Sequence, residues 1–522
     1  MVLRLKFRLW VMLVAVLLAC GQARGEDQGQ ALLDQATDTK LAAENVADLN
    51  QVVKLCQDAI EAGLDEGNTK FANGLLASTL TQRAELVCTE LFERPVTANR
   101  GRKLVQMALA DLEQTLKIDT EQGEAQYLVG RLYAHLGQSE KALASLDNAV
   151  RLSEDDPAAK ARSLIIRANL QKDPVLRQTD FDTAVKLTPK DPNSLRFRGM
   201  HYLSQNKLES AIADLDAAIE IDPKDADTHE ARGVAMSLAK NYDEALVSFS
   251  KAIELEPNSP ASLTHRGRVR AIKGDVPGAL ADVESALRLQ PGSVAALQLH
   301  ASLLGSVGKF EQALADLNLL RRAMPNNSEL ILQIAALHQA AKQPLKAIVA
   351  YDEIVEADPK NAPAYRGRAD VQLSLGKQAE AIADYESALL LEPQNSGVLN
   401  NLAWVLATSP EDTLRNGKRA IELAKQACEV TEYKQAHVLS TLAASYAESG
   451  DFETAITWSK KAVESGGDEL KAQLSKELES YEEKKPWREA APPLGDPADQ
   501  TAQPDKNATP GREDTARNKV GD

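Results

Sequence analysis

The sequence predicts an all-α protein that is built as a solenoid of stacked helix pairs. Three observations support this prediction. The 522 residues exceed the size of one ordinary domain, which suits an extended array. Aromatic residues make up only 4% of the chain, which is low for the core of a β-sandwich or β-barrel. Proline recurs at a constant spacing of 34 residues, at Pro189, Pro223, Pro257, Pro291, Pro325, Pro359 and Pro393.

The chain begins with a stretch that is typical of an export signal. Arg4, Lys6 and Arg8 precede an apolar run over residues 9–19, and this order of charged and apolar residues is the secretory pattern. The run is too short to cross a bilayer core, which needs about 20 residues. We therefore expect residues 1–25 to be a signal peptide and the mature chain to reach the periplasm or the cell envelope.

Two processing sites are consistent with this signal. Residues 17–20, with the sequence LLAC, resemble a lipobox, in which Cys20 would be lipidated and would anchor the chain to a membrane. Residues 23–25, with the sequence ARG, resemble a small-x-small cleavage site, which would release a soluble chain without Cys20. The sequence leaves both alternatives open.

Residues 26–122 are predicted to form an N-terminal helical region with atypical repeats, because apolar residues recur there at helical spacing. Cys56 and Cys88 lie on neighbouring predicted helices of this region. An oxidising compartment would permit a disulfide between them. The alternative is that both are small buried apolar residues.

Further positions recur around each proline. The unit that begins at Ala226 carries small residues at Gly233, Ala245 and Ala252, a ring at Phe249 and a final Pro257. Small residues let two antiparallel helices approach closely, and proline ends the second helix because it lacks the backbone N–H. The turn between the two helices carries Gly, Asn or Lys, as in SLGKQAE and LAKNYDEA. This period and pattern resemble the tetratricopeptide repeat.

The resemblance implies a right-handed superhelical solenoid of antiparallel helix pairs. It covers residues 123–469 as about ten units. Residues 470–487 are predicted to form a charged capping helix, which such arrays need at their ends. Residues 488–522 are rich in proline and poor in apolar residues, so we predict a disordered tail.

The resemblance also implies a binding surface, because in this family the first helix of each pair lines a concave groove. Arginine there could pair with carboxylates, asparagine could bond to a peptide backbone, and tryptophan could act as an anchor. The alternative for each position is that the residue lies on a solvated helix surface and has no binding role. The candidate groove residues are Arg196, Arg268, Arg366, Asn400, Asn401 and Trp404.

Composition and motifs argue against several other functions. Acidic residues number 76 against 60 basic ones, so a net charge of −16 disfavours general binding to nucleic acid. The sequence contains no HExxH, CxxC, GxxxxGK or GxSxG motif, and its seven histidines fall at different repeat phases. We therefore predict no catalytic residue, no metal site and no cofactor.

The leading hypothesis is an exported, non-enzymatic scaffold that mediates protein–protein interactions through its concave first-helix surface. Its partner would be a protein or peptide, and any membrane contact would come from the N-terminal signal or a lipid on Cys20. The alternative is a structural lipoprotein within an envelope assembly or secretion complex. A third hypothesis places an enzyme in residues 26–122, although that segment has no histidine and no recognised motif.

Overall fold

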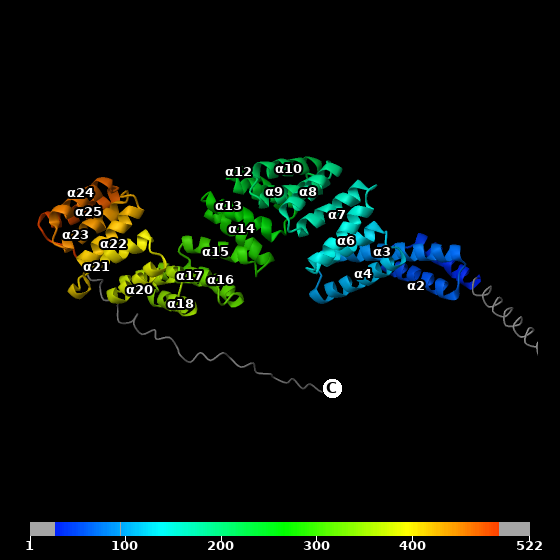
Figure 1. Cartoon of the computed structure of the whole chain (residues 1–522), viewed down its shortest axis with the longest axis horizontal. Coiled ribbons are helices and arrows are strands. Elements are labelled where there is room, and N and C mark those ends of the chain that lie inside the picture. The colour runs from blue at the N-terminus through cyan, green and yellow to red at the C-terminus, as the bar shows by residue number, and fades with distance from the viewer. Residues whose placement is uncertain (1–26, 94–95, 490–522) are drawn as a thin grey trace, which may run out of the picture. The chain divides into compact units, whose positions relative to one another are not determined.

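The computed structural model describes residues 27–93 and 96–489. The predicted signal peptide, Cys20 and almost all of the predicted tail lie outside these residues. Within them every regular element is a helix (Figure 1), which confirms the predicted all-α class. The chain divides into two compact units between Asn258 and Ser259.

The first unit begins with a helix over residues 27–41. It continues with α2 (Val46–Ala62), α3 (Glu66–Glu93), α4 (Ala98–Ile118), α5 (Gly123–His135), α6 (Ser139–Leu152), α7 (Pro157–Leu170), α8 (Pro174–Leu187), α9 (Pro192–Ser204), α10 (Leu208–Ile221), α11 (Ala226–Leu238) and α12 (Tyr242–Leu255). Helices α3 and α4 have 28 and 21 residues, whereas α5 and α6 have 13 and 14. The regular pattern of helix lengths therefore starts at α5.

The second unit continues that pattern. Its elements are α13 (Pro260–Ile272), α14 (Val276–Leu289), α15 (Val294–Ser306), α16 (Phe310–Ala323), α17 (Ser328–Ala340), α18 (Pro344–Ala357), α19 (Ala362–Ser374), α20 (Gln378–Leu391), α21 (Ser396–Thr408), η1 (Asp412–Leu414), α22 (Gly417–Val430), α23 (Ala436–Glu448), α24 (Phe452–Ser465) and α25 (Asp468–Glu482). The 3-10 helix η1 lengthens the connection between α21 and α22. The final helix α25 packs against α24.

Within each unit, a repeat is a helix hairpin that packs on its neighbours. Helix α11 packs against α12 and α13 against α14, and in each unit the second helix of one hairpin contacts the first helix of the next. The turn inside most of these hairpins places a residue in the left-handed region, where glycine is the least strained residue. The residues with positive φ at this turn include Asn206, Lys240, Gly274, Gly308, Lys342 and Gly376. This confirms the predicted use of Gly, Asn or Lys.

The close approach of the two helices depends on the small residue of the first helix. At Gly233, an added Cβ atom would lie 2.6 Å from the ring of Phe249, which is almost fully buried. At Gly199, the same atom would lie 3.0 Å from Leu215. The large side chain of the second helix therefore fills the space that the glycine leaves, as the sequence pattern predicts.

Ion pairs with buried aspartates also recur with the repeat. An arginine on the first helix donates from Nε and Nη2 to both oxygens of an aspartate 16 residues later, over 2.6–2.9 Å. Arg198 and Arg368 also reach Asp182 and Asp352 of the preceding repeat. Each of these two arginines therefore links three helices. The pairs are Arg198 with Asp214, Arg266 with Asp282, and Arg368 with Asp384.

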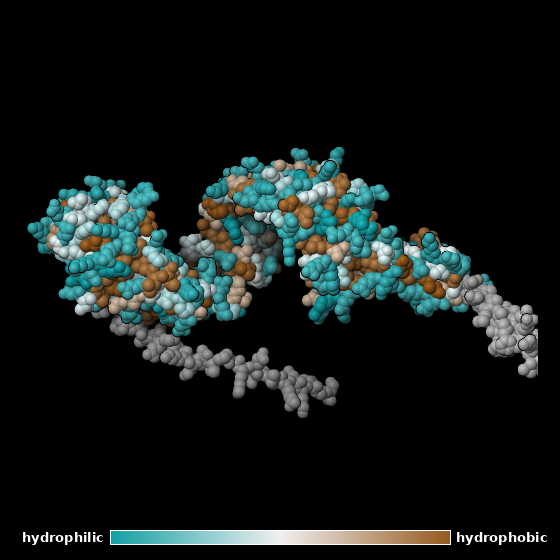
Figure 2. Space-filling model, in the orientation of Figure 1, coloured by the Kyte–Doolittle hydropathy of each residue, from teal (hydrophilic) through white to brown (hydrophobic). Residues whose placement is uncertain are grey.

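The surface of the described chain is mainly hydrophilic, with hydrophobic patches between the polar residues on the face that Figure 2 shows. Among the described residues, no helix has both the length and the apolar character that a membrane crossing requires. The apolar residues gather instead in clusters between successive helices, and one of these clusters extends from α19 to α25. This C-terminal cluster supports the site described next.

Candidate binding site

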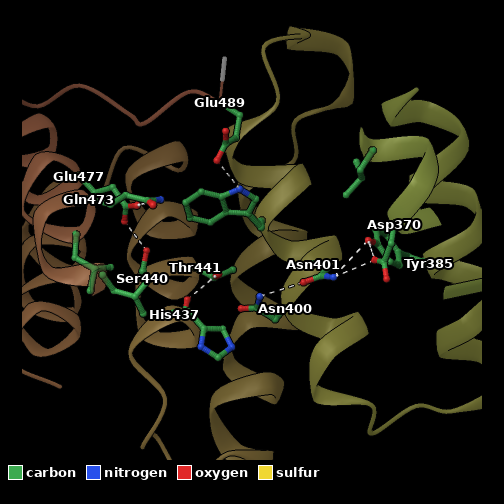
Figure 3. A pocket seen from close by; sticks show the side chains of 14 residues that line it. Asp370, Tyr385, Asn400, Asn401, His437, Ser440, Thr441, Gln473, Glu477 and Glu489 are labelled. Atoms are coloured by element: carbon green, nitrogen blue, oxygen red, sulfur yellow. Dashed lines mark hydrogen bonds between the residues drawn. The ribbon is translucent and has the colours of Figure 1, made fainter. Parts of the chain in front are cut away.

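Three of the six predicted groove residues lie together. Asn400, Asn401 and Trp404 line a cavity of about 380 Å³ in the second unit (Figure 3). Arg268 and Arg366 are exposed and do not line it. The three predicted residues of α21 therefore share one cavity, none of the three predicted arginines lines it, and a binding role for these residues stays a prediction.

The sixth candidate, Arg196, belongs to the first unit and is engaged within the protein. Its guanidinium contacts Asp225 at 3.3 Å and Asp227 at 3.5 Å. Only 15% of its side chain is exposed. Arg196 thus acts as a link between neighbouring repeats, and its charge is already matched by two carboxylates.

The suggested disulfide between Cys56 and Cys88 is not formed. Both residues are buried free thiols. Cys56 packs in a cluster with Val52, whereas Cys88 packs in another cluster with Leu112. Burial raises the pKa of each thiol to about 11. The alternative reading, two small buried apolar residues, describes them correctly.

The sequence of α21 explains why its three polar residues share one face. Leu399, Leu402 and Ala403 are buried, and residues spaced by three or four positions lie on one side of a helix. Asn401 and Trp404 fall on the other side, where both are only half-buried. The helix begins cleanly because the side chain of its N-cap residue, Asn395, accepts a bond from a backbone N–H of the first turn.

One wall of the cavity is a hydrogen-bonded group around Asp370. Asn401 donates from Nδ2 to Asp370 at 3.3 Å, and the Tyr385 hydroxyl donates to the same carboxylate oxygen at 2.5 Å. Burial and the Asp370 charge both raise the pKa of Tyr385, so the phenol remains a proton donor. Asn400 donates to the Asn401 side-chain oxygen at 3.4 Å.

The opposite wall centres on Glu477 of α25, a carboxylate that is only 1% exposed. It accepts bonds from the Ser440 hydroxyl at 2.5 Å and from Gln473 Nε2 at 3.0 Å (Figure 3). Burial raises the pKa of Glu477 and outweighs these two bonds, which act in the opposite direction. Repulsion from the Glu489 carboxylate adds to the upward shift of the pKa.

Residues 483–489 form a C-terminal strap that follows α25 and returns to the end of α21. Arg488 pairs with Glu448 at 2.6 Å. The Glu489 backbone N–H donates to the Thr408 carbonyl oxygen at 3.0 Å. These contacts place the Glu489 side chain at the cavity. There its carboxylate accepts a hydrogen bond from the indole N–H of Trp404 at 3.1 Å, although the two residues are 85 positions apart in the chain.

Sequence reasoning missed Ser440, Gln473, Glu477 and Glu489. A signal for Glu477 was present, because it occupies the apolar stripe between Leu474 and Tyr481, all three of which are buried. The predicted polar capping helix 470–487 therefore differs from the structure in two ways. Helix α25 ends at Glu482 and is followed by the strap, and one of its faces belongs to the core.

The cavity as a whole is rich in hydrogen-bond acceptors. Its carboxylates belong to Asp370, Glu477 and Glu489, and the described lining includes neither lysine nor arginine. The groups that donate to these carboxylates are neutral: a phenol, two amides, a hydroxyl and an indole N–H. The described residues hold no cluster suited to a metal ion. The arrangement suits a ligand that donates hydrogen bonds.

Comparisons with known proteins agree with the repeat pattern. Family models described as tetratricopeptide repeat and TPR repeat match residues 105–157, 199–238, 239–294 and 332–398. No curated protein is significantly similar to this chain.

Solved structures that are similar to this chain include the following three. A tetratricopeptide repeat protein from Parabacteroides merdae is 18% identical over 56% of this chain and 98% of its own length, with a TM-score of 0.36. Yeast Tom70 is 14% identical over 87% and 96%, with a TM-score of 0.38. PilF of Pseudomonas aeruginosa is 18% identical over 42% and 96%, with a TM-score of 0.37.

The family matches fall on the helix hairpins that show the 34-residue period, the small first-helix residues and the left-handed turns. Such repeats imply a scaffold for protein–protein interaction. The chain is a tetratricopeptide-repeat protein.

Proposed function

We propose that this protein is a non-enzymatic scaffold that binds a segment of a partner protein through the first-helix surface of its second unit. The observation that carries the proposal is the cavity beside α21. There a half-buried tryptophan and two adjacent asparagines face a common hollow that is closed at its edge by the C-terminal strap.

The chemistry of this hollow suits a protein segment. Trp404 offers a large rigid surface of the kind that dominates binding energy at interfaces. The amides of Asn400 and Asn401 can bond to backbone N–H and C=O groups. Because Glu489 fixes the indole N–H at 3.1 Å, the ring is held in place before a ligand arrives, which lowers the entropy lost on binding.

The test is crosslinking mass spectrometry on the native envelope fraction with the full chain. The variant Asn401→Ala with Trp404→Ala is expected to remove a partner crosslink that the unchanged chain forms. The matched control is Lys471→Ala with Lys476→Ala, which alters two exposed positions of α25. Circular dichroism checks that both variants keep their helices. Crosslinks that survive in the cavity variant, or turnover of a defined substrate with no partner, would contradict the proposal.

Export to the periplasm or cell envelope is part of the proposal and is supported by the charged and apolar pattern of residues 1–25. The second candidate function, a structural lipoprotein of an envelope assembly, is favoured by the LLAC sequence that ends at Cys20. Incorporation of labelled palmitate that disappears in Cys20→Ala would support the lipoprotein. A mature N-terminus at Glu26, measured by mass spectrometry, would exclude it.

A further inference from the structure

We propose that the cavity beside Trp404 receives a cationic side chain, an arginine or a lysine, of the bound protein segment. This inference rests on the proposed function and specifies the chemistry that the cavity selects. Its carboxylates come from three separated parts of the chain: α19, α25 and the C-terminal strap.

The first argument is uncompensated charge. Asp370, Glu477 and Glu489 all line the cavity, and the described lining residues include no lysine or arginine. Hydrogen bonds from neutral donors orient the three carboxylates, and none of the three forms an ion pair with a lysine or arginine among the described residues. His437 also lines the cavity, and its side chain carries positive charge when protonated. Because a cation at the centre would attract all three at once, the cavity is electrostatically complementary to a positive group.

The second argument is the burial of Glu477. An ionised carboxylate that is withdrawn from water is unfavourable unless a cation accompanies it. Glu477 is 1% exposed, and among the described residues only Ser440 and Gln473 donate hydrogen bonds to it. The nearby Glu489 charge further opposes its ionisation. A ligand cation would relieve this burial penalty, so binding would recover part of the free energy that the burial costs.

The third argument is an acceptor without a donor. Asn400 lines the cavity, and its side-chain oxygen is shielded from water and has no hydrogen-bond partner among the described residues. Such an orphan is satisfied by a ligand N–H. Guanidinium carries five N–H donors and ammonium three. Neither group has a hydrogen-bond acceptor, so no acceptor of the ligand would face the carboxylate and amide oxygens of the lining.

The fourth argument is the apolar part of the lining. Leu373, Leu470, Leu474 and Trp404 contribute to the cavity alongside the carboxylates. The methylene stem of arginine or lysine packs on apolar surface while its charged head bonds to polar groups. The Trp404 ring adds a face that attracts cations. A volume of about 380 Å³ is also sufficient for one long side chain.

The experiment titrates the full chain with three small probes: Nα-acetyl-arginine N-methylamide, the lysine counterpart and the neutral citrulline counterpart. The readout is the indole N–H resonance of Trp404, assigned by its disappearance in Trp404→Phe. We expect the arginine or the lysine probe to bind at least tenfold more tightly than citrulline, and the two arms show which cation is preferred. Equal binding of citrulline would overturn the proposal.

Two variants test the carboxylates. Glu477→Gln and Asp370→Asn keep the shape of each side chain, and each is expected to weaken the cationic probe about tenfold, as for the loss of one close charge. Glu464→Gln changes an exposed carboxylate of α24 and serves as the control, with unchanged affinity. Undiminished binding in both cavity variants would overturn the proposal.

A stability measurement separates lost binding from lost folding. Because Glu477→Gln removes a buried charge, this variant is expected to have a higher melting temperature at neutral pH while it binds the probe more weakly. The crosslinking assay keeps the two proposals distinguishable. If the partner crosslink is lost in Asn401→Ala with Trp404→Ala but survives in Glu477→Gln and Asp370→Asn, the scaffold stands and cation selection fails.

The chain itself supplies one competing occupant. Residues that follow Glu489 include Lys506, Arg512, Arg517 and Lys519. The full chain with these four changed to glutamine should bind the cationic probe with unchanged affinity. A tightening of tenfold or more would assign the cavity to the tail and overturn the assignment to a partner.

Discussion

At the scale of single residues, charge and burial decide what each polar side chain can do. Arg368 and Arg366 are two positions apart on α19, yet Arg368 links Asp384 and Asp352 while Arg366 is exposed. At the position of Arg368 in an earlier repeat, Ile334 is buried in an apolar cluster. The repeat therefore accepts either an ion pair or a hydrophobic contact there, in line with their similar net stability.

Removing one partner of such a pair is more damaging than replacing both. Arg368→Ala would leave the Asp384 carboxylate, which is 8% exposed, without its cation. We expect a loss of about 2 kcal/mol in the free energy of unfolding, below the value for a fully buried pair because Arg368 is partly exposed. Urea denaturation measures it, and Arg366→Ala is the matched control. Equal losses in the two variants would refute the structural role of Arg368.

Glu477 predicts a pH dependence. Burial raises its pKa in the folded protein above the ordinary value of 4.5. At pH values between the unfolded-state pKa and the raised folded-state pKa, the folded state therefore binds more protons than the unfolded state. Stability should therefore fall as pH rises through this window. Glu477→Gln removes that loss, so its melting temperature should exceed that of the unchanged chain at pH 7.

The comparison at low pH provides the control for this prediction. As pH falls well below 4.5, Glu477 becomes protonated in both the folded and the unfolded state. The advantage of Glu477→Gln should therefore shrink there. Calorimetry across pH 4–7 tests both halves, and an advantage that is constant with pH would contradict the assigned cause.

At the scale of one element, the helix hairpin depends on its turn as well as on its apolar stripe. The residue in the left-handed region reverses the chain after the first helix. Residues other than glycine are strained in this conformation by roughly 1–2 kcal/mol. Lys240 and Lys342 tolerate φ values of 61° and 56°. Packing of the hairpin therefore outweighs the local strain at these two turns.

The turn supplies a prediction with a matched control. Gly308 has φ of 76° and open space around an added Cβ atom, so Gly308→Ala is expected to destabilise the protein by about 1 kcal/mol through backbone strain alone. Gly292 also has open space, but its φ is not positive. Gly292→Ala should therefore be neutral or slightly stabilising. Thermal denaturation of both variants measures the difference, and equal effects would contradict the backbone explanation.

At the scale of the whole molecule, stability is local. The principal packing contacts join helices that lie one or two places apart in the order of elements. In such arrays stability is approximately a sum of repeat terms and nearest-neighbour terms. Damage to one hairpin should therefore spread to its neighbours and no further.

Hydrogen exchange tests this locality. An added Cβ atom at Gly130 would lie 2.6 Å from Leu146, so Gly130→Val forces α5 and α6 apart. We expect exchange to accelerate by about tenfold or more in α4–α7, which corresponds to roughly 1.4 kcal/mol of lost local stability. Peptides from α21–α24 should keep their rates. Acceleration throughout the chain would show that the molecule unfolds as one cooperative body.

The candidate site was only partly predictable. Repeat position alone identified Asn400, Asn401 and Trp404 as candidates, because they lie on the first helix of a repeat, at positions that line the groove in this family. Arg196 has the same phase but is neutralised by Asp225 and Asp227. The position of a residue within the repeat predicts which face of the helix it occupies. It does not predict which neighbouring charged side chain forms an ion pair with that residue.

The sequence by itself determined the all-α class, the hairpin period, the small helix contacts and the turn residues, because each of these is a local pattern that recurs every 34 residues. Only the tertiary structure decided that Glu477 and Glu489 join Trp404 at one cavity. These residues come from the final helix and the strap, which depart from the period. Contacts across 85 residues outside the repeat depend on how the last helix packs, and no local pattern encodes that packing.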